Sequence, residues 1–598
     1  MRYRIFSSLF ALMLSSVVAT ALAQAPGHSA TGQPARLPGQ PSPAGREAKR
    51  WEPWSAMRMA AAPILGWNVG ISADRFPQLT LFTTLESTDS LHLSNVEGSS
   101  SQKVDEGIPK NVDYNLQPGE ITAIQDKLFA LNIRMVAYQF PAMGPDETSS
   151  RKLFGFAKDL KVETIVLERI PEDLSLVDKL ANEYGLNVAL CGNLKDVLAA
   201  VQGHSDRLGV CADTGVWLQE GRKPVETLSQ IKERLLVVGL RDRSALGATG
   251  HNVALGTGVA GIPQFLREMC RLEIKPSLIT VDATGSTNTM ADTSRSLDDF
   301  EKALLPVMAE RVDEISRTTE SRGPDRLSPE EKQKIESALP TEAPAKPRKL
   351  RKLLVLDLNI AYGGHRSIPA ENYALAMMGQ KTGAYEAVFN DNLDNLKYPK
   401  IKDYDAIFLN NTVGMIFVDP EVREGLLRFV REGGGLGGNH STSHASMDWP
   451  EFHEMIGVTR GVHRQNTEKF WVKIDDPHSP LTAAFHGQEF EYQDEFFRFV
   501  TPPYSRDKLH ILLSMDVAKT DMNQGTPFMP GTLSRPDSDY AVSWIRSYGK
   551  GRVFFCILGH NPTLFDSPEL ALYFLSGIQF MLGDLDADTT PSSTLPVK

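Results

Sequence analysis

The sequence contains few cysteines and, beyond its first two dozen residues, no long apolar run. Its four cysteines, Cys191, Cys211, Cys270 and Cys556, show no C-x-x-C spacing, which argues against a cysteine zinc site and a dithiol redox motif. They lie in apolar segments, and two interpretations stay open: buried free thiols, or a disulfide between Cys191 and Cys211. No later segment reaches the roughly 18 uninterrupted apolar residues of a membrane-spanning helix, so we expect no membrane span.

The sequence also lacks an excess of basic residues. Lys and Arg number 63 against 74 Asp and Glu, which gives a net charge of −11. This balance provides no electrostatic footprint for nucleic acid or for an anionic membrane, so we expect neither as a partner. At 598 residues the chain is too long for one hydrophobic core, and two or three domains are expected. The sequence gives no indication of the oligomeric state.

The N-terminus has the pattern of a secretory signal peptide. Arg2 and Arg4 precede the apolar run Ile5–Val18, and Ala21-Leu22-Ala23 forms a small-x-small cleavage site. We therefore predict cleavage after Ala23 and export to the periplasm or the medium. Residues 24–55 are rich in Pro, Gly, Ala and Ser and are typical of a disordered leader.

A polar, proline-bearing segment at residues 311–350 is typical of a linker. Within it, Ser328 can cap a helix, Pro329 suits the first helical position, and two acidic residues follow, so we predict a short helix there. The linker divides the chain into globular parts at 56–310 and 351–585, followed by a disordered tail at 586–598.

The first globular part alternates short apolar runs with amphipathic segments. The expected strands are Trp67–Ile71, Arg134–Tyr138, Thr164–Leu167, Asn187–Leu190, Leu208–Cys211, Leu235–Val238 and Ser277–Val281. Such an alternation over about 250 residues predicts an α/β domain of the (β/α)8 TIM barrel type, with any active site at the carboxyl ends of its strands.

Three segments of this part resemble the xylose-isomerase-like sugar isomerases and epimerases. They are Cys211–Trp217, Val237–Asp242 and Asn252–Gly258, which are similar to the D-T-G-H-W, H-L-K-D and glycine-rich motifs of that family. The resemblance covers nearly the whole of residues 56–310. It implies a TIM barrel with a divalent metal at its mouth and carboxylates that transfer protons next to a sugar carbonyl.

By position, the resemblance implies Glu168, Asp213 and Asp282 as metal ligands, whereas Gly239 stands where the family has a ligand His. A site without that imidazole offers mainly oxygen donors, which suit Mg²⁺ or Mn²⁺ better than zinc. The alternative is a barrel that has lost its metal and serves for binding or scaffolding, with Asp213 paired to Arg241 or Arg243.

The second globular part also alternates strands and helices. The expected strands are Leu353–Leu358, Tyr385–Phe389, Asp405–Leu409, Gly435–Gly438 and Arg552–Leu558, and the expected helices are Ala370–Gly379, Pro420–Glu432 and Glu569–Met581. This β-α-β-α order predicts a doubly wound open parallel sheet of the flavodoxin or glutamine amidotransferase type.

Polar side chains follow four of these strands. They are His365, Asn410, His440 and His560, and ligands of open parallel sheets bind at the carboxyl ends of the strands. His440 is presented by a sharp turn after the glycine-rich strand, where some α/β enzymes expose a nucleophile. His444 lies four residues later, on the same face if a helix follows. Two imidazoles with a carboxylate can hold a transition metal, and a His beside a carboxylate suits acid–base catalysis.

Six segments in order resemble the ThuA-like (trehalose utilisation) family, which has the class I glutamine amidotransferase-like fold. They are Gly364–Ile368, Tyr404–Ile407, Gly433–His440, Trp449–Phe452, Asp494-Glu495 and Gly549–His560. The resemblance implies action on trehalose, other glycosides or oxidised (keto) sugars. Thiol-based amide hydrolysis is excluded, because the turn carries Asn439-His440 and Cys556 lies inside the last strand.

These observations define the candidate residues and two classes of function. The catalytic candidates are His365, His440, Asp494, Glu495 and His560; the substrate-binding candidates are Asn410, Asn439, Trp449 and Arg535; and His444 is a further metal-ligand candidate. The first class is an exported carbohydrate-active enzyme, such as an isomerase, lyase or hydrolase, assisted by Mn²⁺, Mg²⁺ or Zn²⁺. The second is a non-catalytic carbohydrate-binding protein with degenerate sites in both domains. The expected partner in both is a sugar.

Overall fold

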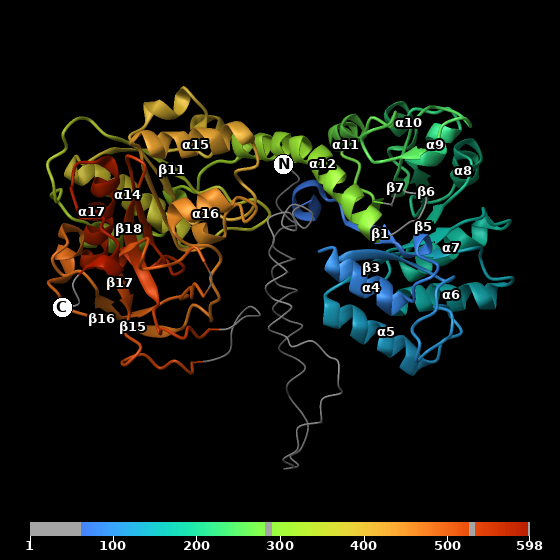
Figure 1. Cartoon of the computed structure of the whole chain (residues 1–598), viewed down its shortest axis with the longest axis horizontal. Coiled ribbons are helices and arrows are strands. Elements are labelled where there is room, and N and C mark those ends of the chain that lie inside the picture. Colours follow the sequence, from blue (N-terminus) through green and yellow to red (C-terminus); the bar gives the residue numbers. More distant parts are fainter. Residues whose placement is uncertain (1–60, 282–289, 501, 525–532, 596–598) are drawn as a thin grey trace, which may run out of the picture.

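The computed structural model describes residues 61–281, 290–500, 502–524 and 533–595. It contains the two predicted α/β domains, with the barrel in blue to green and the C-terminal domain in yellow to red (Figure 1). No helix within those ranges has the length and apolar character needed to span a membrane. The predicted signal peptide and almost all of the leader lie outside the described residues, as does Asp282.

The first domain is a closed barrel of eight parallel strands, as predicted. In barrel order the strands are β1 (Val69–Ser72), β10 (Leu278–Val281), β7 (Leu235–Leu240), β6 (Leu208–Asp213), β5 (Asn187–Leu190), β4 (Thr164–Leu167), β3 (Arg134–Phe140) and β2 (Asn95–Ser99). Strand β2 was not predicted. Its five residues are all buried, but they include Asn95, Glu97 and Gly98. Its hydrophobic pattern is therefore weak.

Helices follow most of the barrel strands and cover the outside of the barrel. They are α4 (Leu81–Ser90), α5 (Pro118–Leu131), α6 (Glu147–Asp159), α7 (Leu174–Tyr184), α8 (Leu194–Val201), α9 (Thr214–Gln219), α10 (Pro224–Ile231) and α11 (Ile262–Arg271). Polar residues at the strand ends also cap several of these helices. Asn193 accepts from Lys195 N, and Asp213 accepts from Val216 N. The carboxyl ends of the strands are thus fixed by the helices that follow them.

A single helix, α12 (Met290–Thr318), connects the domains (Figure 1). It packs against α11 and β10 in the barrel, and its last turns reach the C-terminal domain. There, Arg317 Nε donates to Asp394 Oδ2 at 3.0 Å and Leu393 N donates to Ser316 Oγ at 3.3 Å. The first residues of the predicted 311–350 linker are therefore helical, because they anchor this helix to the second domain.

The rest of the linker lies against the C-terminal domain. The predicted short helix is α13 (Pro329–Ala338), with Ser328 and Glu331 forming a capping box. It packs on α14 (Ile368–Thr382). The segment up to residue 595, which was predicted to be a disordered tail, contacts the second domain instead. Ser592 Oγ accepts a hydrogen bond from Ile511 N at 2.8 Å.

The second domain is built on a nine-stranded sheet. In sheet order the strands are β12 (Glu386–Phe389), β11 (Lys352–Leu356), β13 (Ala406–Leu409), β14 (Gly435–Asn439), β19 (Gly551–Cys556), β18 (Ala541–Tyr548), β17 (His510–Met515), β15 (Lys469–Ile474) and β16 (Phe490–Gln493). The first five are parallel, as predicted, and the last four pair antiparallel. The predicted open parallel sheet is therefore present, and four antiparallel strands that were not predicted extend it into a mixed sheet.

Four of the parallel strands, β11, β13, β14 and β19, are buried almost throughout, which requires helices on both sides. The helices of this domain, besides α14, are α15 (Pro420–Glu432), α16 (Pro450–Ile456) and α17 (Pro568–Leu582). Glycines in β14 let α17 approach closely, since a Cβ at Gly435 would lie 2.3 Å from the backbone oxygen of Met581 and one at Gly437 only 2.2 Å from its Sδ. The glycine-rich strand thus seats α17 and directs its carboxyl end to the site.

Candidate metal centre

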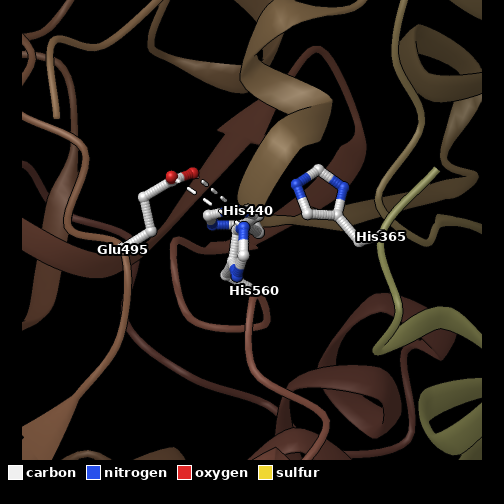
Figure 2. Close-up of side chains that lie close together, drawn as sticks. All are labelled: His365, His440, Glu495 and His560. Carbon is white, nitrogen blue, oxygen red and sulfur yellow. Dashed lines mark ion pairs between the residues drawn. The ribbon is translucent and has the colours of Figure 1, made fainter. Parts of the chain in front are cut away.

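Four predicted catalytic residues meet at the carboxyl edge of the parallel strands. His365 lies in the loop after β11, His440 directly follows β14, His560 lies just after β19, and Glu495 follows β16. Figure 2 shows the three imidazoles and the carboxylate converging on one point. One ligand atom from each lies within 4.8 Å of those of the others. Among the described residues, this is the one group of His, Cys, Asp and Glu side chains arranged to hold a metal ion.

The turn after β14 forces His440 into the cluster. Its φ of +41° is in the left-handed region. A residue other than glycine adopts this conformation at an energetic cost, and such strained residues are concentrated at functional sites. Its Nδ1 donates to the carbonyl oxygen of Ile557 at 3.0 Å, and its ring stacks on Phe497 with centroids 4.4 Å apart. The fixed Nδ1–H leaves Nε2 to face the cluster, as a metal-binding tautomer requires.

The distances within the cluster favour a bound cation. His440 Nε2 lies 3.3 Å from Glu495 Oε2, and His560 Nε2 lies 3.9 Å from Glu495 Oε1. Two of the nitrogens, His440 Nε2 and His560 Nδ1, are buried without a hydrogen-bond partner, which is costly for polar atoms unless a partner fills the gap. Three imidazoles and one carboxylate are a ligand set that suits Zn²⁺ and related transition metals. The residues therefore fit a divalent metal.

The protonation states agree with that role. Burial disfavours charge on Glu495, yet the imidazoles of His440 and His463 lower its pKa well below the usual value. Burial also opposes charge on His440, but the neighbouring Glu495 carboxylate raises its pKa. Burial, followed by repulsion from His440, lowers the pKa of His365 to about 2 and also lowers that of His560. At neutral pH, Glu495 is thus an anion and His365 is neutral, which are the states that bind metals, whereas the raised pKa of His440 means that a bound metal must displace a proton from its ring.

Asp494, also a catalytic candidate, does not enter the cluster. Its carboxylate accepts the backbone N–H groups of Gly559 at 2.9 Å, His560 at 3.3 Å and Asn561 at 3.1 Å. Burial raises its pKa to about 6. Asp494 therefore holds the loop that carries His560, which makes it a positioning residue.

The predicted substrate-binding residues make contacts within the fold. Asn410 Nδ2 donates to Asn372 Oδ1 at 2.8 Å, and Asn439 Nδ2 donates to Glu371 Oε2 at 2.9 Å; both asparagines are fully buried. Glu371, which the sequence analysis missed, lies beneath the turn, and burial raises its pKa to about 8. These two side-chain amides make buried hydrogen bonds close to the turn at His440.

Trp449 and Arg535 are likewise engaged elsewhere. Trp449 is 3% exposed and stacks on Phe452 with ring centroids 5.6 Å apart. Arg535 pairs with Asp537 at 2.6 Å and lies over the ring of Tyr504. The structure therefore gives both residues packing partners within the domain.

Three other residues surround the cluster. His444, at the end of the 3-10 helix His440–His444, packs on Phe497, and burial lowers its pKa to about 3. His463 Nδ1 lies 3.0 Å from Glu495 Oε1. No motif or periodic pattern around His463 predicted this contact. Tyr362 is 48% exposed, and its ring lies 5.4 Å from that of His365. Its place before Gly363-Gly364-His365 was the only signal for it.

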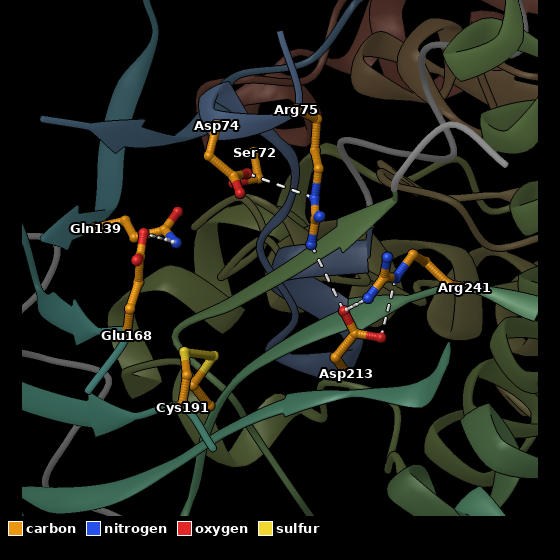
Figure 3. The surroundings of a disulfide bond; sticks show 9 residues. Ser72, Asp74, Arg75, Gln139, Glu168, Cys191, Asp213 and Arg241 are labelled. Carbon is orange, nitrogen blue, oxygen red and sulfur yellow. Dashed lines mark hydrogen bonds and ion pairs between the residues drawn. A yellow bond between two sulfur atoms is a disulfide. The ribbon is translucent and has the colours of Figure 1, made fainter. Parts of the chain in front are cut away.

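Two of the three barrel carboxylates that the xylose-isomerase resemblance implied as metal ligands, Asp213 and Glu168, have partners within the protein. Asp213 is bound by Arg241, whose Nε lies 3.0 Å from Oδ1 and whose Nη2 contacts Oδ2, and Arg75 Nη2 lies 3.6 Å from Oδ2 (Figure 3). Glu168 accepts from Gln139 Nε2 at 3.0 Å. The pairing of Asp213 with Arg241, which the metal-free alternative predicted, is present, and the guanidinium occupies carboxylate oxygens that a metal would need.

The disulfide left open by the sequence is present. Cys191 and Cys211 are bonded across the neighbouring strands β5 and β6, with Cα atoms 4.9 Å apart, while Cys270 and Cys556 are free thiols. Burial raises the pKa of Cys556 to about 12, which agrees with an inert thiol inside β19.

Comparisons with known proteins give matches to parts of the chain. No curated protein matches the chain. A solved structure of an uncharacterised protein from Parabacteroides distasonis is 25% identical, covering 40% of this chain and 98% of its own, with a TM-score of 0.34. A xylose isomerase domain protein from Planctomyces limnophilus is 17% identical, covering 42% and 98%, with a TM-score of 0.31. The IOLI protein with a binding zinc atom is 13% identical, covering 41% and 99%, with a TM-score of 0.32.

The family model described as trehalose utilisation (ThuA) matches residues 352–581. That range contains His365, His440, Glu495 and His560. The C-terminal domain of this chain therefore belongs to the ThuA family and carries the candidate metal centre.

Proposed function

We propose that the C-terminal domain is a metal-dependent enzyme that acts on a glycoside or keto-sugar by proton transfer next to a carbonyl. The observation that carries this proposal is the convergence of His365, His440, Glu495 and His560 at the carboxyl edge of the sheet, in a domain of a family described as trehalose utilisation. A divalent ion bound there polarises a carbonyl or hydroxyl oxygen and stabilises negative charge that develops on it.

The residues around the cluster suit a sugar substrate. The side chains of Glu495 and His560 are 12% and 27% exposed, whereas that of His440 is fully buried, so a substrate reaches the cluster from the side of Glu495 and His560. Tyr362, 48% exposed next to His365, offers a ring on which a sugar face can pack. His463 holds Glu495 in place from the other side.

The test measures metal content and proton exchange in the full-length protein. Wild-type protein is expected to hold about one equivalent of divalent metal and to exchange the C–H next to the carbonyl of a keto-glucoside in D₂O, detected by ¹H NMR. His440→Ala is expected to lose both while keeping the circular dichroism spectrum of the folded protein, and His478→Ala, at an exposed histidine outside the cluster, is the matched control. Exchange that persists in His440→Ala would refute the proposal.

A non-catalytic role is the competing function, and the barrel gives it specific support because Arg241 binds Asp213 where metal-assisted catalysis would be expected. Sugar binding to the full chain that is insensitive to chelators and produces no exchange would favour this role for the C-terminal domain as well.

We also propose that the protein is exported. The support is the signal-peptide pattern at residues 1–23 together with the disulfide between Cys191 and Cys211, since disulfides persist mainly in oxidising compartments.

A further inference from the structure

The mouth of the barrel contains a cavity of about 460 Å³, within the range of small-ligand sites. It lies at the carboxyl ends of the strands, where barrel enzymes place their sites. Its charged lining residues are Asp74, Arg75, Glu97, Glu168, Asp213, Glu220 and Arg241. This site is separate from the His and Glu cluster and does not depend on the function proposed for it.

Both carboxylate oxygens of Asp213 already accept hydrogen bonds from the protein. Besides the two bonds from Arg241 and the contact with Arg75, its Oδ1 accepts from Val216 N at 3.0 Å. A cation binding there would have to displace a bidentate guanidinium, which is among the stronger ion pairs in proteins. Arg241 comes from the loop directly after β7, whose Gly239 pairs in register with Asp213. The guanidinium group of Arg241 thus supplies the positive charge next to Asp213.

The remaining charges disfavour an anionic ligand. Arg241 is neutralised by Asp213, and Arg75 Nε lies 3.5 Å from Asp74 Oδ1. Among the described residues, the lining has five carboxylates and two guanidinium groups, so a sugar acid or phosphate would meet net negative charge. Carboxylates and amides are good partners for hydroxyl groups, because they accept and donate the hydrogen bonds that a polyol offers.

The floor of the cavity is apolar. It includes the disulfide between Cys191 and Cys211, together with Val166 and Val237, and Figure 3 shows the disulfide near the Gln139–Glu168 pair. An apolar floor below a polar rim matches a sugar ring, which has C–H faces and a hydroxylated edge.

From these features we propose that the barrel mouth binds an uncharged sugar or polyol without a metal, with the guanidinium of Arg241 in the place of the cation. Glu168 and Gln139 then contact the hydroxyl groups, and Arg241 keeps Asp213 occupied.

The test uses calorimetric titration of the full-length His440→Ala protein in EDTA, so that the C-terminal centre does not contribute. The probes are D-glucose and D-glucuronate, which share a ring and differ in charge. Glucose is expected to bind, glucuronate to bind more weakly, and Glu168→Ala to weaken glucose binding about tenfold through the loss of hydrogen bonds near 1 kcal/mol each. Glu172→Ala, at an exposed acid outside the lining, is the matched control.

A second variant addresses the role of Arg241. Arg241→Ala releases Asp213 and is expected to gain Mn²⁺ binding that the His440→Ala parent lacks, with circular dichroism confirming the fold. The proposal is overturned if the parent already holds Mn²⁺ through Asp213, if glucose binding requires a metal, if glucuronate binds more tightly than glucose, or if neither probe binds.

Discussion

At the scale of single residues, the site depends on how each side chain is held. His440 was predicted because it follows a glycine-rich strand, and its positive φ and fixed Nδ1–H explain why that position directs Nε2 inward. His463 was not predicted, because it lies in an irregular loop with no periodic pattern. Its contact with Glu495 arises only when the antiparallel strands bring that loop to the parallel edge. Sequence patterns report local geometry, whereas such contacts depend on tertiary packing.

A substitution of His463 tests whether this tertiary contact contributes to the metal site. His463→Ala is expected to weaken metal binding by about 10- to 100-fold, the usual effect of removing a group that orients a ligand, because Glu495 loses one of its two imidazole neighbours. Competition with a chromophoric chelator measures the affinity, and His478→Ala serves as the control. An unchanged affinity would show that His463 does not orient Glu495.

At the scale of elements, the connecting segment after α12 supports the metal centre directly. Arg322 donates from Nη1 to Asp357 Oδ1 at 2.9 Å and from Nη2 to the carbonyl of Gly363 at 3.3 Å. A side chain at Gly364 would collide with Arg322, since its Cβ would lie 2.6 Å from Nη2. The loop that carries His365 is therefore packed against a residue from outside the sheet.

Arg322→Lys is expected to keep most of the stability but to weaken metal binding several-fold. A lysine retains the charge next to the fully buried Asp357 but cannot hold Asp357 and Gly363 together with a planar fork. Removing the charge with Arg322→Ala is expected to cost about 3–5 kcal/mol. Arg326→Lys, at an exposed site, is the control. Equal metal affinity in Arg322→Lys and wild type, measured by chelator competition, would contradict this role.

The glycine strand β14 was predicted to within one residue, because its composition admits few other structures. The antiparallel strands β15 to β18 were not, since segments such as Phe490–Gln493 are short and only partly buried and give a weak period of two. Strand β2 was missed for a similar reason. The parallel strands could thus be predicted from their hydrophobic pattern. The antiparallel strands, which lead to Glu495, could not.

Close packing on β14 leads to a stability prediction. Gly435→Ala is expected to destabilise the C-terminal domain by about 1–3 kcal/mol, as overpacked cores do, because the new Cβ meets backbone atoms of α17. Urea unfolding followed by fluorescence measures the loss. Gly155→Ala in α6, where no atom lies within 4 Å of the added Cβ, is expected to be neutral or stabilising. A neutral Gly435→Ala would mean that α17 does not press on the strand.

At the scale of the whole molecule, two sugar-related candidate sites use different chemistry. The C-terminal domain gathers imidazoles and a carboxylate, whereas the barrel pairs its carboxylate with arginine. Helix α12 joins the domains through contacts at both of its ends. Both folds could be predicted from motif order, and the pairing of Asp213 with Arg241 was one of the predicted alternatives. The contact of Asp213 with Arg75 was not predicted, because Arg75 lies far away in the sequence, directly after β1.

Export is the prediction that belongs to the whole chain. Expression in a Gram-negative host is expected to yield a periplasmic protein whose intact mass corresponds to a start at Gln24, because the small-x-small site ends at Ala23. The mass is also expected to be 2 Da lower than that of the reduced protein, from the Cys191–Cys211 bond. A full-length cytoplasmic product would contradict this assignment.

The central claim is that His365, His440, Glu495 and His560 bind one divalent metal ion. Anomalous X-ray diffraction from crystals of the full-length protein grown with Zn²⁺ or Mn²⁺ tests it most directly. We predict one strong anomalous peak at about 2.0–2.2 Å from the ligand atoms of these residues, and none at Asp213. No peak among the four side chains at saturating metal, or a peak in the barrel mouth instead, would contradict the claim.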